Sequence, residues 1–210
     1  YFKKSLKLDL SFFGENHPSV ASGYYNIGYV YFAQGDYSKA LEYFEEVLKI
    51  RLSVYGENHS RVASVYNDIG EIYSVQGDDF KALDYFKKSL KIVLSVYGEN
   101  HSQVSSIYDH IGEIYFAQKD YSKALYYFEE SLKIRLSLFG ENHPEVALSY
   151  YSIGSLYIIQ GDKSKALNYY EKSLKIRLSV YGENHPLTKE IMDLINVANS
   201  KVLQSPETTK

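Results

Sequence analysis

The sequence repeats itself with a period of 42 residues. A pentapeptide that starts Gly-Glu-Asn-His begins at Gly14, Gly56, Gly98, Gly140 and Gly182. Its fifth residue is Pro in three copies and Ser in the other two. A fixed period of about 20–50 residues is the sequence signature of a solenoid or array, in which each unit completes its core against its neighbours. The period therefore predicts a repeat architecture.

Each repeat has the pattern of two amphipathic helices. In the first repeat, apolar residues fall in steps of three and four from Val20 to Tyr31, which is the spacing of one helix face. Gly35 and Asp36 then interrupt the pattern. Gly suits the left-handed conformation that closes a helix, and Asp can cap the next one. A second helical pattern follows and continues to Leu52, so each repeat is predicted to be a helix pair.

The repeated histidines are interpreted as helix boundaries rather than metal ligands. Gly56 suits a helix end, Asn58 or His59 stands where an N-cap would be, and Pro18 fits a first helical turn. Ligands of one ion must each lie about 2 Å from it. Histidines one repeat apart are separated by two helix packings of roughly 8–10 Å each. We therefore expect no metal site and no cofactor.

A longer motif runs through every repeat and carries a family resemblance. It reads aromatic–x–x–Ile–Gly–x–x–Tyr, then Gly-Asp-Tyr–x–x–Ala–Leu–x–x–Phe. Its first copy consists of Tyr24, Ile27, Gly28, Tyr31, Gly35, Asp36, Tyr37, Ala40, Leu41 and Phe44. The pattern resembles the tetratricopeptide repeat (TPR), whose usual period is about 34 residues. The extra residues follow Leu48, and this longer form resembles the repeats of kinesin light chains and of the TPR arrays attached to nucleotide-binding signalling proteins.

The resemblance implies an all-α fold, a right-handed TPR solenoid of antiparallel helix pairs. The expected parts form one continuous solenoid domain: an orphan second helix at 1–13, helix pairs at 18–55, 60–97, 102–139 and 144–181, a C-terminal capping helix at 186–203 and a disordered tail at 204–210. Because Tyr1 falls inside a repeat, we expect the chain to be a piece of a longer protein. Lys119 replaces a turn glycine, and we expect this to cost stability locally.

Composition and motifs argue against several function classes. The formal net charge is −3 and the chain has no Lys/Arg-rich run, so neither nucleic acid nor a membrane is an expected partner. Cys is absent, which excludes disulfides and thiolate chemistry. We find no Walker loop, nucleophile elbow, Rossmann fingerprint or His-Glu-x-x-His motif. The chain is therefore predicted not to be an enzyme, and a cytoplasmic location is favoured.

The resemblance also implies that the first helix of each pair lines a concave groove that holds a peptide or a helix. Carried over position by position, the expected groove residues are Tyr25, Asn26, Tyr29, Asn67, Asp68, Glu71, Asp109, His110, Glu113, Tyr151, Ser152 and Ser155. Four acids stand at the centre of this set, where chaperone-binding TPR domains and kinesin light chains present basic residues. We therefore predict a ligand with basic residues at its centre and apolar anchors at its ends. The alternative is that the acids form a solvated face. His110, with Asp109 and Glu113, is likewise interpreted as a groove residue rather than a metal or acid–base site.

The predicted function is a non-catalytic protein–protein interaction scaffold. One alternative is the sensor or autoinhibitory arm of a multidomain signalling protein, whose ligand belongs to the same chain. Another is a structural spacer that self-associates end to end through the exposed N-terminal half-repeat, where Phe2 and Leu6 lack their first helix. An enzyme accessory module is the least favoured. The sequence defines neither the partner nor the parent protein.

Overall fold

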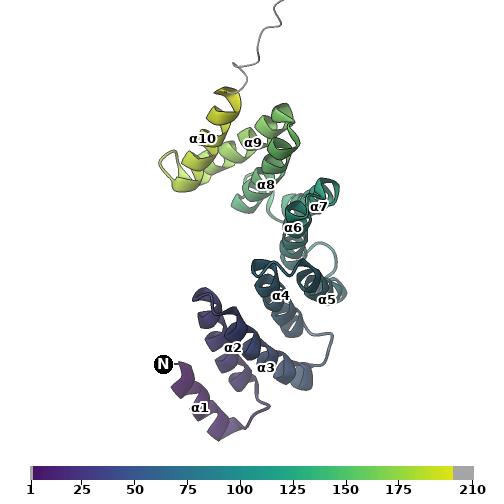
Figure 1. The fold of residues 1–210 in the computed structure, drawn as a ribbon, viewed down its shortest axis with the longest axis vertical. Helices are drawn as coiled ribbons and strands as arrows, with labels where there is room; N and C mark the ends of the chain where they lie inside the picture. Colours follow the sequence, from purple (N-terminus) through teal and green to yellow (C-terminus); the bar gives the residue numbers. More distant parts are fainter. Residues whose placement is uncertain (1, 201–210) are drawn as a thin grey trace, which may run out of the picture. The chain divides into compact units, whose positions relative to one another are not determined.

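The computed structural model describes residues 2–200, and these form ten α-helices without a strand (Figure 1). In chain order the helices are α1 (Phe2–Phe13), α2 (Pro18–Ala33), α3 (Tyr37–Tyr55), α4 (Ser60–Val75), α5 (Asp79–Tyr97), α6 (Ser102–Ala117), α7 (Tyr121–Phe139), α8 (Pro144–Gln160), α9 (Lys163–Tyr181) and α10 (Pro186–Ser200). The all-α prediction is confirmed. The predicted tail at 204–210 and the last part of the predicted capping helix lie outside the described residues.

The chain divides into two compact units. The first unit is Tyr1–Glu99, with α1 to α5, and the second is Asn100–Lys210, with α6 to α10. In each unit the main contacts join helices that follow one another in the chain, as α2 does with α3 and α8 with α9. The single continuous domain that the sequence suggests stays a prediction.

The five histidines of the repeated pentapeptide cap helices. The Nδ1 atoms of His17, His59, His101, His143 and His185 each accept a hydrogen bond from the backbone N–H two residues further on, at 3.1–3.2 Å. These bonds satisfy N–H groups that the first helical turn leaves without a partner. The imidazole also stacks on the aromatic residue that ends the preceding helix, as in Tyr55–His59 at 4.5 Å and Phe139–His143 at 4.3 Å. The recurrence of histidine thus has a structural cause.

The turn inside each helix pair is closed by an aspartate. Asp36, Asp78, Asp120 and Asp162 each accept a hydrogen bond from the backbone N–H three residues further on. The residue before the aspartate has a positive φ, for example 77° at Gly35. Lys119 takes this place in the third repeat with φ 62°. A side chain in the left-handed region costs roughly 1–2 kcal/mol, so the sequence departure noted above is a strained position.

The two helices of a pair approach closely because the first one carries a glycine in its middle. A Cβ added to Gly112 would lie 2.7 Å from Cε1 of Phe128, and one added to Gly70 would lie 2.8 Å from Cε1 of Phe86. These rings are buried, with Phe86 0% and Phe128 4% exposed. The glycine of the first helix therefore packs chiefly against an aromatic ring of the second helix. This ring follows the buried alanine of the motif by one helical turn.

The first and last helices differ from the rest. Phe2 on α1 holds the repeat position of Phe44, yet it is 45% exposed, compared with 2% for Phe44. Helix α10 packs on α9 and buries Thr188, Ile191 and Ala198. Asn196 stands at the α10 position where Gly28 stands in the first repeat. An Asn side chain has no space against a ring placed like those of the other pairs, so α10 is not suited to receive another second helix.

Candidate functional site

The residues predicted to line the groove fall on the first helices of the pairs. Helices α2 and α4 carry six of them in the first unit, and α6 and α8 carry six in the second. We call these two surfaces the α2/α4 face and the α6/α8 face. The α2/α4 face consists of Tyr25, Asn26, Tyr29, Asn67, Asp68 and Glu71. The α6/α8 face consists of Asp109, His110, Glu113, Tyr151, Ser152 and Ser155.

On the α2/α4 face, Tyr25 is joined to Asp68. Burial, together with the charge of Asp68 and a hydrogen bond to it, raises the pKa of Tyr25 to about 12. Asn67 precedes Asp68 on α4, and its side-chain amide donates to Oε1 of Glu71, one turn further on, at 2.7 Å. The buried Oδ1 atom of Asn67 accepts no hydrogen bond from the described residues. Asn26 is exposed, and Tyr29 is 58% exposed. The face therefore presents the exposed Tyr29 ring together with the Glu71 carboxylate, and it contains the buried Asn67 Oδ1 atom, which accepts no hydrogen bond from the described residues.

A buried arginine on α3 contacts residues of both helices that form this face. Arg51 on α3 donates to the backbone carbonyl of Arg61 at 2.7 Å and to Oγ of Ser64 at 2.9 Å. Its guanidinium also lies 5.2 Å from the centroid of the Tyr25 ring. A planar guanidinium suits this combination of bonds and stacking. Arg51 thus joins α3 to the first turn of α4 and fixes Tyr25.

On the α6/α8 face, Asp109 is held in an internal ion pair. Arg135 on α7 lies 2.7 Å from Oδ2 of Asp109 and 3.0 Å from Oε2 of Glu145, and it donates to Oγ of Ser149 at 2.8 Å. The side chains of Arg135 and Asp109 are 5% and 18% exposed. Burial raises the pKa of Asp109, and the charge of Arg135 opposes that shift. The charge of Asp109 is therefore balanced within the protein.

The neighbouring residues of α6 face solvent more openly. The Glu113 side chain is 67% exposed, and its Oε2 atom lies 3.9 Å from Nδ1 of His110, which is 30% exposed. Of the two acids predicted on this helix, Glu113 is thus the accessible one. Within residues 2–200, no group of three His, Cys, Asp or Glu side chains is arranged to hold a metal ion.

At the other end of this face, α8 is joined to α10. Tyr151 donates to Oε1 of Glu190 at 2.9 Å, and Arg177 on α9 lies 5.0 Å from the Tyr151 ring centroid. Arg177 also donates to the backbone carbonyl of Leu187 at 2.6 Å. Ser155 Oγ donates to the Tyr151 carbonyl at 2.9 Å, and Ser152 is half-buried. These contacts leave Tyr151 positioned rather than freely mobile.

Sequence reasoning missed the arginines that contact the predicted face residues, although a signal was present. Arg51, Arg135 and Arg177 occupy one repeat position, and Val93 occupies it in the second repeat. The residue that faces this position from the first helix changes with it. Tyr25 and Tyr151 each lie against the guanidinium of an arginine, and Asp109 forms an ion pair with one. Asn67 stands in the repeat that has valine. Each arginine therefore has a partner that suits a cation.

Comparisons with known proteins agree with the geometry. A family model described as tetratricopeptide repeat matches residues 1–53, 20–93, 61–137 and 103–179. A search of curated proteins gave no match. In none of the described helices is there a stretch long and apolar enough to cross a membrane.

Solved structures show the same fold. The crystal structure of BtubC (BKLC) from P. vanneervenii is similar with a TM-score of 0.75 at 18% identity, covering 100% of this chain and 91% of that one. A Podosopora anserina kinesin light chain candidate with nearly identical TPR-like repeats gives a TM-score of 0.69 at 16% identity, covering 90% of this chain and 99% of that one. The apo form of RapI gives 0.73 at 18% identity, covering 87% of this chain and 64% of that one. At this identity the likeness concerns the fold alone.

Proposed function

Since the chain belongs to the tetratricopeptide repeat family, which is a protein-interaction fold, we propose that it is a non-catalytic scaffold that binds a segment of a partner protein. The α2/α4 face and the α6/α8 face are each proposed as a binding surface within its own unit. The observation that carries the proposal is the chemistry of the α2/α4 face, where the exposed Tyr29 ring on α2 accompanies the Glu71 carboxylate on α4. Exposed aromatic anchors beside polar groups are typical of interaction hot spots.

The ligand that fits these faces has a basic residue flanked by apolar side chains. Asp68, Glu71 and Glu113 supply the negative charge. A hydrogen bond from the neutral Tyr25 hydroxyl leaves the charge of Asp68 in place, whereas Asp109 is paired with the cation Arg135. Tyr29 and Phe32, whose ring centroids lie 6.4 Å apart, supply an apolar contact surface on α2. The prediction of a basic ligand thus rests on three of the four acids that the sequence suggested.

A peptide-array screen followed by titration tests this proposal. The whole chain is screened at low and at physiological salt, and the best basic peptides are titrated against Glu71→Gln, Glu113→Gln and Tyr29→Ala variants. We expect each charge removal to weaken binding by about fivefold to tenfold, and Tyr29→Ala by about thirtyfold, which is roughly 2 kcal/mol. Glu57→Gln, in an exposed loop, is the matched control and should leave the affinity unchanged. Equal affinity for all four variants would show that these faces are not the binding surface.

The sensor or autoinhibitory arm remains an alternative within this proposal. It uses the same two faces, but the ligand is a segment of the parent protein. Screening the array with peptides from the parent chain separates the two cases, because a regulatory arm would bind one of its own segments more tightly than unrelated basic peptides.

A self-associating spacer is the second candidate, and one observation favours it. Phe2 and Phe12 on α1 are 45% and 78% exposed, and Phe2 differs in this from the buried ring at its repeat position in the first complete pair, Phe44, at 2%. The occupant that suits them is α1 of a second copy in a symmetric contact, because Asn196 makes α10 a poor partner for a ring such as Phe2. Sedimentation equilibrium should then show dimers that a Phe2→Asp/Phe12→Asp variant abolishes. A concentration-independent monomer mass for the unmodified chain would exclude the spacer.

A further inference from the structure

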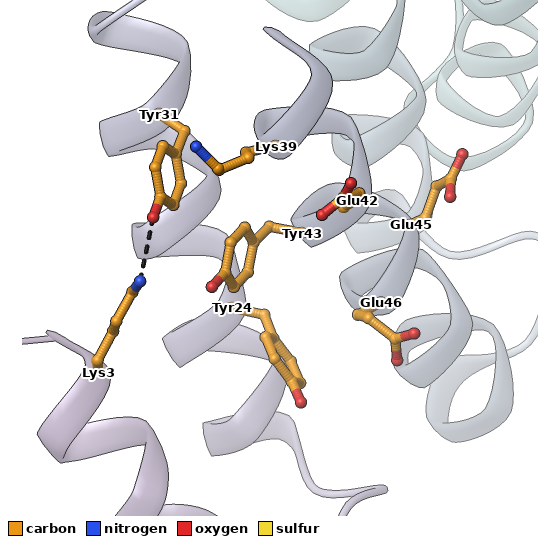
Figure 2. A pocket seen from close by; sticks show the side chains of 8 residues that line it. All are labelled: Lys3, Tyr24, Tyr31, Lys39, Glu42, Tyr43, Glu45 and Glu46. Carbon is orange, nitrogen blue, oxygen red and sulfur yellow. Dashed lines mark hydrogen bonds between the residues drawn. The ribbon is translucent and has the colours of Figure 1, made fainter. Parts of the chain in front are cut away.

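A cluster of three tyrosines lies on a different side of α2 from Tyr25. Tyr24 and Tyr31 of α2 meet Tyr43 of α3, with ring centroids 6.0 and 5.5 Å apart (Figure 2). The Tyr31 and Tyr43 rings are stacked, whereas Tyr24 is tilted by 45° against Tyr43 and forms a corner with it. The same corner recurs in the other repeats as Tyr66–Tyr85, Tyr108–Tyr127 and Tyr150–Tyr169.

In two repeats a lysine of the chain itself occupies this corner. Lys88 Nζ lies 4.9 Å from the Tyr85 centroid and 6.0 Å from the Tyr66 centroid. Lys172 Nζ lies 5.3 Å from the Tyr169 centroid and 5.5 Å from the Tyr150 centroid. An ammonium group within about 6 Å of a ring centroid is attracted by the electrons of the ring face. The protein therefore shows twice that this tyrosine corner holds an ammonium group.

In the first repeat the corresponding residue is Glu46 instead of lysine. The corner there opens into a cavity of about 540 Å³, lined by Lys3, Tyr24, Tyr31, Lys39, Glu42, Tyr43, Glu45 and Glu46 (Figure 2). We call it the α1–α3 pocket. Lys3 and Lys39 both lie over the Tyr31 ring, at 5.5 and 5.1 Å. Among the described residues, no lysine or arginine lies over Tyr24 or Tyr43.

The third repeat also has a glutamate in place of the lysine. Glu130 stands there and pairs with Lys133 at 3.5 Å, as Glu46 of the first repeat pairs with Lys49 at 3.8 Å. The Tyr126 ring stands edge-on against Tyr127 with centroids 5.2 Å apart. Tyr126 occupies the repeat position that Glu42 has in the first repeat. In the first repeat, the tyrosine corner thus occurs together with a cavity and several carboxylates.

We propose that the α1–α3 pocket binds the ammonium group of a lysine side chain from a partner protein. The lysine takes the place that Lys88 and Lys172 have in their own repeats, with its Nζ over the Tyr24 and Tyr43 rings and near the carboxylates of Glu42 and Glu46. Burial raises the pKa of Tyr24, and the negative charges of Glu46 and Glu15 raise it further. The pocket is a second binding surface and does not depend on the α2/α4 face.

Nuclear magnetic resonance of the whole chain with ¹³C-labelled tyrosine rings tests the proposal. The probe is N-acetyl-lysine methylamide, and its Nε-acetylated form, which lacks the positive charge, is the control. Signals are assigned with Tyr24→Phe and Tyr43→Phe variants. We expect the charged probe to shift the Tyr24 and Tyr43 signals in the millimolar range and the neutral control to leave them in place. Equal responses to both compounds, or no response, would overturn the proposal.

Two charge swaps use the internal copies as controls. Glu46→Lys supplies the lysine that the second and fourth repeats already have, so it should keep the melting temperature and weaken probe binding at the Tyr24–Tyr43 corner at least tenfold. Lys172→Glu combined with Asn168→Glu copies Glu46 and Glu42 into the fourth repeat, and should create a probe response at Tyr150 and Tyr169. An undiminished response in Glu46→Lys would contradict the proposal. So would shifts confined to Tyr25 and Tyr29, which belong to the α2/α4 face.

Discussion

Removal of Arg135 should destabilise the protein far more than its single position suggests. The Arg135→Val variant copies the valine that the second repeat has as Val93, so the fold is known to accept the side chain. It nevertheless leaves Asp109, only 18% exposed, without the guanidinium 2.7 Å away. Breaking a buried ion pair by removing one partner costs about 3–5 kcal/mol. We expect a loss of unfolding free energy in that range.

A double variant separates the ion pair from the other contacts of Arg135. Adding Asp109→Asn reproduces the Asn67 and Val93 combination of the second repeat and removes the buried charge. The double variant should therefore lose only about 1–2 kcal/mol, since a neutral amide is less costly to bury than a carboxylate. Asp109→Asn alone should lose about 1–3 kcal/mol, because Arg135 keeps Glu145 at 3.0 Å. The two single losses together exceed the loss of the double variant, so the double-mutant cycle should show a coupling of about 4–5 kcal/mol.

Urea unfolding at several pH values provides the measurement. Burial holds the pKa of Asp109 above its ordinary value, and loss of Arg135 raises this pKa further because the arginine charge lowers it. A folded-state pKa above the unfolded value favours the protonated native state. The deficit of Arg135→Val should therefore be largest at neutral pH and shrink as the pH falls through the folded-state pKa. A deficit below about 1 kcal/mol, or one that the double variant does not relieve, would refute the reasoning.

Three further predictions concern the local devices of the fold. Lys119→Gly should raise the unfolding free energy by about 1 kcal/mol, because Lys119 has φ 62°; thermal melting measures it, and no gain would mean that the turn is unstrained. His59→Ala should cost about 1–2 kcal/mol through the lost cap and ring stacking, whereas His59→Asn should recover part of it; equal losses would exclude a capping role. Tyr25 has a pKa of about 12 when folded, so stability should fall as the pH rises from about 10 to 12; Tyr25→Phe should make that alkaline loss shallower in denaturant titrations, and an unchanged slope would contradict the assignment.

Much of the fold could be predicted because its determinants are local in sequence. The period, the aspartate after each turn and the glycine inside each first helix specify a helix pair from neighbouring residues alone. The sequence left the N-cap open between Asn58 and His59. The structure decides for His59, since its Nδ1 atom reaches the N–H of Arg61 at 3.1 Å. That choice depends on the φ and ψ angles at the cap, which a residue pattern does not encode.

The candidate site was less predictable because its electrostatics are not local. The sequence places Asp109 on a helix face, but its counter-ion Arg135 lies on the following helix and was interpreted only as part of a longer helix. Once the two side chains meet at 2.7 Å, Asp109 is charge-balanced, and Glu113 is left as the accessible acid of α6. The role of the predicted face residues in binding stays a prediction.

The histidine caps have a consequence for how such a chain can change its length. The loop from Gly56 to His59 lies between α3 and α4. Tyr55, the last residue of α3, stacks on His59, and His59 caps α4. Arg51 and Arg177 bridge the same kind of loop from the helix behind to the carbonyls of Arg61 and Leu187. The junctions after α3 and α9 are thus held by contacts between residues that lie within about ten positions of one another. A duplication or deletion of a whole 42-residue repeat therefore joins two chain ends that already form these local contacts. The number of repeats can change in this way without new contacts between helices having to evolve.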